Sequence, residues 1–83
     1  MEIRPFLYVN QIAECGSMTK AAAALFITQP ALSNYISKLE EELGVRLFYS
    51  FNREQRLTDE GLRLMNGARR LMERALPPTV TGG

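Results

Sequence analysis

The sequence predicts a mainly α-helical fold in which three helices form a core, a two-stranded hairpin follows, and a longer helix ends the chain. Three observations lead to this prediction. The 83 residues, 46% of them apolar and 23% charged, have the length and composition of one small globular domain. Glycines at 16 and 44 stand where helices commonly end. Apolar residues recur at helical spacing except in residues 45–57, where that spacing is lost.

A first helix is expected over residues 5–15, because proline suits a first helical turn and Gly16 permits a left-handed end. Its apolar stripe consists of Phe6, Leu7, Val9, Ile12 and Ala13. A second helix is expected from the capping residue Ser17 to residues 25–26. Its four alanines, residues 21–24, favour a close crossing with another helix.

The third helix is expected to run from the cap Thr28 to Leu43, with Gly44 after its end. Four residues at helical spacing should form its core face: Leu32, Ile36, Leu39 and Leu43. The opposite face is polar and consists of Gln29, Pro30, Ser33, Asn34, Ser37, Lys38 and Glu41. Residues Glu40–Glu41–Glu42 are predicted to form a solvated helix end.

Two short strands are expected around residues 47–49 and 55–57, joined by a turn through Asn52–Arg53. The last helix is capped by Thr58 and extends to about residue 76. Its apolar residues cover about half of its circumference, which is more than one packing surface needs. Part of it is therefore expected to pair with a second copy of the chain, and the alternative is a wholly intramolecular stripe. The expected dimer interface is Leu64, Met65, Ala68, Leu71, Met72 and Ala75.

Residue types on which enzymes rely are missing. The chain has no histidine and one cysteine, so it lacks the commonest proton shuttle, an internal disulfide and a thiolate metal cage. It also lacks the glycine-rich loops that hold phosphates. An enzyme is therefore the least expected class, and no cofactor or metal is expected. Cys15 is predicted to be a small buried apolar residue.

The net charge of +1 indicates no bulk attraction to a polyanion, so any binding of nucleic acid must come from local geometry. This near-neutral charge is the main support for a rival hypothesis, a helical protein-interaction module without a nucleic-acid partner. No apolar run approaches the ~18–20 residues that span a bilayer, and the N-terminus lacks the pattern of a signal peptide. A cytoplasmic location is therefore expected.

Residues 18–37 describe a helix-turn-helix motif, since two helices are joined by a very short link. A recognition helix in the DNA major groove needs short, hydrogen-bonding side chains at its start, and Thr28, Gln29, Pro30 and Ser33 fit this need. Gln29 is suited to adenine and Pro30 to a thymine methyl group. Residues 45–57 would form a wing whose tip residue, Arg53, reaches a minor groove or a phosphate. The alternative for Gln29, Pro30 and Ser33 is a role in capping the helix alone, and the alternative for Arg53 is a solvated turn residue without a ligand. Further candidate contacts are Lys20, Lys38 and Arg56.

The chain resembles the N-terminal winged helix-turn-helix domain of LysR-type transcriptional regulators. The resemblance is carried by the stretch GSMTKAAAALFITQPALSNYISKLEEELGVRLF, followed by RLTDEG, and it covers residues 2 to about 76. It implies sequence-specific binding of double-stranded operator or promoter DNA by a homodimer, which becomes a tetramer in full-length members. Residues 1–58 would be the DNA-binding domain, and residues 58–76 the linker helix for dimerisation. Gln29, Pro30, Ser33 and Arg53 match positions at which family members contact DNA.

The chain also departs from the family pattern. Members often carry a basic residue where this chain has Asn34 and Ser37, so weaker non-specific binding is expected. Asn34 is a lesser candidate for reading adenine, and Ser37 remains a candidate DNA contact. Residues 77–83 are expected to be a tail without the effector-binding domain of the family, either in a fragment or in a natural single domain. An inducer would act only through that absent domain.

Overall fold

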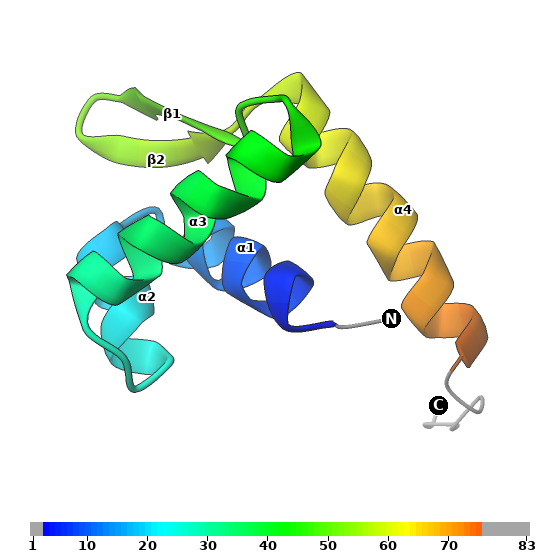
Figure 1. The fold of residues 1–83 in the computed structure, drawn as a ribbon, viewed down its shortest axis with the longest axis horizontal. Coiled ribbons are helices and arrows are strands. Elements are labelled where there is room, and N and C mark those ends of the chain that lie inside the picture. Colours follow the sequence, from blue (N-terminus) through cyan, green and yellow to red (C-terminus); the bar gives the residue numbers. More distant parts are fainter. Residues whose placement is uncertain (1–2, 76–83) are drawn as a thin grey trace.

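The computed structural model describes residues 3–75 of the chain, and the side chains of residues 3–70. It contains four helices and a two-stranded antiparallel sheet, which is the winged helix-turn-helix architecture that the sequence predicts (Figure 1). The elements in chain order are α1 (Arg4–Cys15), α2 (Met18–Ala24), α3 (Gln29–Leu43), β1 (Phe48–Phe51), β2 (Glu54–Leu57) and α4 (Asp59–Ala75). None of the described helices is both long and apolar enough to cross a membrane.

Local sequence signals set the ends of the first three helices. The N–H group of Gly16, which has a φ of 66°, donates to the Ile12 carbonyl at the end of α1. The Ser17 side chain accepts a hydrogen bond from the Lys20 N–H at the start of α2. Gly44, with a φ of 73°, closes α3 in the same way as Gly16 closes α1. These glycine ends and the serine cap are confirmed.

The core lies where the first three helices meet the base of the hairpin. Val9, Ile12, Ala21, Leu32 and Leu47 are fully buried, and Ala22, Ile36, Phe48 and Met65 join them. Rings from α1 and α3 pack together beside this core, because Tyr8 and Tyr35 lie with their centroids 4.7 Å apart. The crossing of α1 and α3 is therefore lined by aromatic side chains.

Four details of the predicted core are wrong. Leu7 on α1 is 50% exposed, and Leu43 is 44% exposed because it is the last residue of α3 and the chain turns away there. Of the four alanines only Ala21 and Ala22 are buried, since a helix of seven residues buries one face. Cys15 is half-buried, and its sulfur accepts a hydrogen bond of 3.4 Å from the Gln11 amide.

The hairpin is longer than predicted. Its register pairs Phe48 with Leu57 at the base and Phe51 with Glu54 next to the turn. The two turn residues, Asn52 and Arg53, have φ values of 51° and 66°. Positive φ at both positions is typical of the two-residue turn that matches strand twist, so the ladder continues up to the turn.

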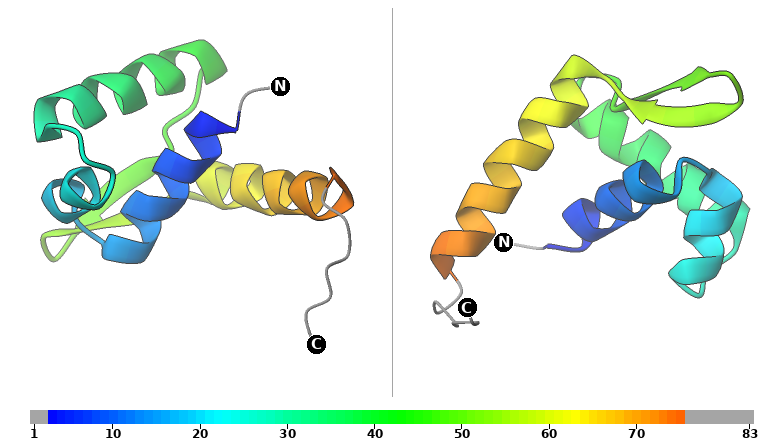
Figure 2. Two further views of the ribbon diagram at one scale, coloured as in Figure 1. Left: turned by 90° about the horizontal axis from the view of Figure 1, so that it is seen from below. Right: turned by 180° about the vertical axis from the view of Figure 1, so that it is seen from behind.

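The last helix starts beside the base of the hairpin (Figures 1 and 2). The Thr58 N–H donates to the Leu47 carbonyl at 2.9 Å, and the Thr58 hydroxyl donates to the Arg46 carbonyl at 2.6 Å. The same hydroxyl oxygen accepts from the Gly61 N–H at 3.0 Å, which confirms Thr58 as the cap. Gly61 is buried against Leu47, and a Cβ atom there would lie 2.6 Å from the Leu47 carbonyl oxygen. This explains why the sequence has glycine at that position.

Candidate nucleic-acid interface

The start of α3 is shaped by its own first residues. The Thr28 side-chain oxygen accepts a hydrogen bond of 3.2 Å from the Ala31 N–H, and its carbonyl accepts one of 3.1 Å from the Leu32 N–H. Pro30 occupies the first turn, where its missing N–H leaves no unmade hydrogen bond. Thr28 therefore caps α3, as the sequence predicts.

The side chains that follow form an exposed polar face. Gln29, Pro30 and Asn34 are exposed, and Ser33 is half-buried. The Gln29 amide nitrogen donates to the Ser33 hydroxyl at 2.9 Å. Because an amide has two N–H donors and an acceptor oxygen, this bond orients the Gln29 side chain and leaves donor and acceptor capacity for a base edge.

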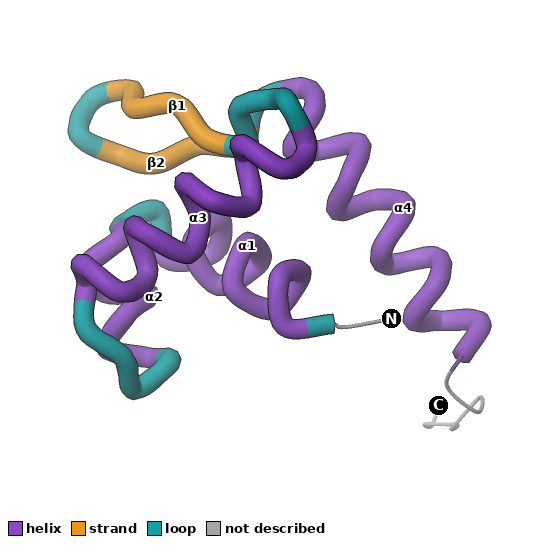
Figure 3. The backbone as a smooth tube through the Cα atoms, viewed as in Figure 1, coloured by secondary structure: helices purple, strands orange, loops and turns teal. Residues whose placement is uncertain are grey.

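A hollow separates this part of α3 from the hairpin. Its walls come from α2, α3 and the hairpin and include Met18, Ser33, Ser37, Arg46 and Gln55. The start of α3 and the turn of the hairpin lie on the same side of the molecule (Figures 1 and 3). The fold therefore brings the polar start of α3 and the hairpin tip to one surface.

Arg53 occupies the tip of the hairpin and is exposed. Among the described side chains, the ion pairs are Arg46 with Glu40 and Arg56 with Glu54. The Arg53 guanidinium takes part in neither, so its charge remains available to a ligand.

Arg56 differs from Arg53 although both lie on the hairpin. Its guanidinium pairs with Glu54 at 3.2 Å and lies 4.9 Å from the centre of the Phe51 ring. Cross-strand register places Arg56 beside Tyr49, whose side chain is 46% exposed. Tyr49 and Phe51 therefore share one face of the hairpin with Glu54 and Arg56. The ion pair with Glu54 balances part of the Arg56 charge.

The two candidate lysines lie on different helices, Lys20 on α2 and Lys38 in the second half of α3. Lys38 lies beside Pro5, Tyr35 and Glu42, at a hollow on the α1 side of α3. Lys20 is an exposed residue of α2. Lys38 does not line the hollow between α3 and the hairpin.

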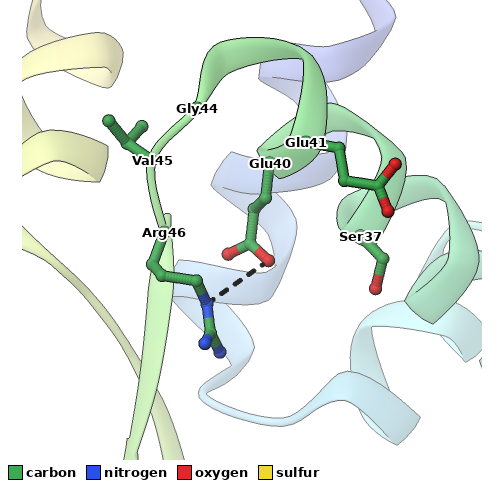
Figure 4. Close-up of a pocket in the computed structure, with 6 residues that line it drawn as sticks. All are labelled: Ser37, Glu40, Glu41, Gly44, Val45 and Arg46. Carbon is green, nitrogen blue, oxygen red and sulfur yellow. Dashed lines mark ion pairs between the residues drawn. The ribbon is translucent and has the colours of Figure 1, made fainter.

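The sequence prediction missed the role of Glu40. Of the three acidic residues, Glu41 and Glu42 are solvated as expected, whereas the Glu40 side chain is only 16% exposed. Its carboxylate accepts hydrogen bonds from the Leu47 and Phe48 N–H groups at 2.7 and 3.4 Å. Figure 4 shows the Glu40 side chain pointing from α3 toward Arg46. No periodicity in the sequence signals a bond across this loop.

A second missed residue lies in the turn between α2 and α3. Phe26 has a φ of 61° and a side chain that is 94% exposed. A bulky residue rarely adopts this left-handed conformation, which costs about 1–2 kcal/mol. The residue type gives no sign of it, because glycine or asparagine would be expected there.

The side chains of three of the six candidate dimer residues on α4 are described by the structure. Met65 and Ala68 are buried within their own protomer, at 7% and 4% exposure, and Leu64 is half-buried. Leu62 is 51% exposed. The side chains of Leu71, Met72 and Ala75 lie outside the described residues, as do Leu76 and the tail of residues 77–83. In the described part of the chain, no three acidic or cysteine side chains lie close enough together to hold a metal ion.

Comparison with known proteins gives a consistent result. Residues 3–62 match the model of the bacterial regulatory helix-turn-helix protein, lysR family. The transcriptional regulator ClcR of Pseudomonas putida is 40% identical over 72 residues, which are 87% of this chain and 24% of ClcR. Other curated relatives are likewise longer, since the chain covers 19% of one and 42% of another.

Two similar solved structures are of DNA complexes. The crystal structure of the CbnR_DBD–DNA complex has a TM-score of 0.77 and 37% identity, and the match covers 90% of this chain and 86% of that one. The BenM_DBD/benA site 1 DNA complex has a TM-score of 0.78 and 40% identity, covering 89% of this chain and 83% of that one.

Proposed function

The chain belongs to the lysR family of bacterial regulatory helix-turn-helix proteins, and we propose that it binds double-stranded DNA sequence-specifically as the DNA-binding part of a transcriptional regulator. One observation carries the proposal: the start of α3, which bears the Gln29–Ser33 hydrogen bond, and the hairpin turn, which contains Arg53, lie on one side of the molecule. A helix start and a cationic hairpin tip on one surface suit a major groove and the phosphates or minor groove beside it. Two structurally similar proteins have been solved as DNA complexes.

The proposed contacts differ in what they supply. Gln29, Pro30, Ser33 and Asn34 read base edges, because they follow one another along the start of α3 and all but the half-buried Ser33 are exposed. Arg53 binds the minor groove or a phosphate. Secondary phosphate contacts are assigned to Lys20, Ser37, Lys38 and Arg56, and the ion pair of Arg56 with Glu54 makes it the weakest of these.

For the whole protein, we infer a homodimer joined through α4. The most exposed apolar side chain in the described part of that helix is Leu62, and the half-buried Leu64 follows two residues later. Met65 and Ala68 are buried within their own protomer, so they would support this dimer interface without contacting the second copy. The proposed regulator is a cytoplasmic, non-enzymatic protein, and any small-molecule inducer acts through an effector domain outside this chain.

Selection of binding sites from random duplexes, followed by titration of the selected duplex at two salt concentrations, tests the DNA-binding proposal. A preferred sequence and an affinity that falls with salt are expected. Gln29→Ala should lose about 1–3 kcal/mol on that duplex and lose preference at one base pair. Asn66→Ala, which removes an exposed amide from α4, is the matched control and should keep both. Binding without sequence preference or salt dependence would refute the proposal.

A further inference from the structure

The base of the wing, residues 46–48, is held to the recognition helix by one carboxylate. One oxygen of Glu40 accepts from the Leu47 N–H at 2.7 Å and from the Phe48 N–H at 3.4 Å. The other oxygen lies 3.6 Å from the Arg46 guanidinium. The three residues of the wing base thus all contact one side chain of α3, and Figure 4 shows its ion pair with Arg46.

The two backbone bonds matter more than the ion pair. The Arg46 side chain is 79% exposed, and exposed ion pairs contribute little because water and salt screen them. Leu47 is fully buried, so its N–H would lose a partner in a place that water does not reach. A charged acceptor also forms roughly twice as strong a hydrogen bond as a neutral one. Glu40 therefore fixes the path of the backbone at Leu47.

The wing needs such an anchor because two strands alone are marginally stable. Its other described backbone anchors are the Gln55 N–H bond to the Gly16 carbonyl, at 3.0 Å, and the Thr58 bond to Leu47. Neither involves α3. Among these bonds, only the carboxylate of Glu40 ties the wing directly to the helix that carries Gln29.

A small change at the base would be amplified at the tip. Phe48 and Asn52 are four residues apart, about 13 Å along an extended strand, so a rotation of about 10° at the base displaces the tip by about 2 Å. That displacement is larger than the range over which a hydrogen bond forms. The mutual position of Arg53 and Gln29 therefore depends on the base.

We propose that Glu40 is a positioning residue for DNA binding: without touching DNA, its carboxylate holds the wing base against α3 so that Arg53 and Gln29 engage one site together. The inference rests on the proposed DNA-binding function. It assigns a role in affinity to a negative charge in the second half of the recognition helix, where charge alone would predict repulsion from DNA.

A double-mutant cycle with Arg53 tests this role. Glu40→Gln keeps the size of the side chain and a neutral acceptor, so the protein is expected to fold, with thermal unfolding followed by circular dichroism. It should bind the selected duplex more weakly than wild type, by no more than Arg53→Ala does. In the Arg53→Ala background it should change affinity by less than about twofold, because the wing contact is already lost. Glu41→Gln removes a neighbouring exposed charge and should not weaken binding.

Amide hydrogen exchange gives a readout that does not depend on DNA. Exchange at Leu47 should accelerate in Glu40→Gln, while exchange at Ile36 within α3 should stay at the wild-type rate. Equal losses of affinity from Glu40→Gln in both backgrounds, or no loss in either, would overturn the inference while leaving the DNA-binding function intact. Wild-type protein that fails to select any DNA sequence would remove the function and the inference together.

Discussion

The recognition helix and the wing reach the same surface by different routes. The start of α3 is fixed by residues within a few positions of one another, through the Thr28 cap and the Gln29–Ser33 bond. The wing is fixed by residues far from its tip, through Gly16, Glu40 and Thr58. The end of the molecule proposed to read bases is thus determined locally, whereas the end proposed to bind phosphates depends on tertiary packing.

Gly61→Ala should show the largest effect, because it disturbs the wing base from α4. The added Cβ would lie 2.6 Å from the Leu47 carbonyl oxygen and 2.9 Å from a Leu57 methyl carbon, and backbone cannot yield as a flexible side chain does. We expect a loss of about 1–3 kcal/mol in unfolding free energy, measured by urea denaturation.

Gly67→Ala is the matched control, since no heavy atom lies within 4 Å of that added carbon. It should stabilise α4 by about 0.5–1 kcal/mol, as alanine does in a helix. Equal unfolding free energies of the Gly61→Ala and Gly67→Ala variants would show that α4 is not closely packed against Leu47.

Thr28→Ala should cost about 1 kcal/mol by leaving the Ala31 N–H without its cap. Its effect should stay local, so amide exchange should accelerate in the first turn of α3 and not at Leu47. Thr28→Ser keeps the hydroxyl and should remain close to wild type. Faster exchange at the wing base in Thr28→Ala would contradict the separation of the two regions.

Arg53→Gly should separate stability from binding. Glycine relieves the left-handed strain at a φ of 66°, so unfolding free energy should rise by at most about 1 kcal/mol. Loss of the cation should lower DNA affinity and reduce the salt slope by about one unit. Arg53→Ala shares the loss of charge but keeps the strain. Wild-type affinity in Arg53→Gly would show that the tip does not bind DNA.

Phe26→Asn should give the smallest effect, a stabilisation below about 1 kcal/mol, because asparagine tolerates the left-handed region and little packing is lost from a ring that is 94% exposed. Phe26→Ala also removes the ring but retains the strain, so it should not be stabilised. Thermal unfolding of the two variants measures the difference. A destabilised Phe26→Asn would indicate that the ring has a packing role.

The same division explains what the sequence could predict. The caps, the glycine ends and the turn at Asn52–Arg53 follow from a few neighbouring residues, and they were predicted correctly. The exposed polar face of α3 follows from helical spacing. Glu40 could not be identified, because its bonds reach seven and eight residues along the chain into an irregular segment. The exposure of Leu43 and the left-handed Phe26 depend on where neighbouring elements end, which periodicity does not encode.

Leu47 is bonded on both sides, to α3 through its N–H and to α4 through its carbonyl. The direction in which α4 leaves the domain is thereby tied to the recognition helix by a single residue. In the proposed dimer, the distance between two half-sites on the duplex would follow from that exit angle, and the side chains touching bases would have no influence on it. Family members with the same base-reading residues are then expected to prefer different spacer lengths when they differ at positions 58–61.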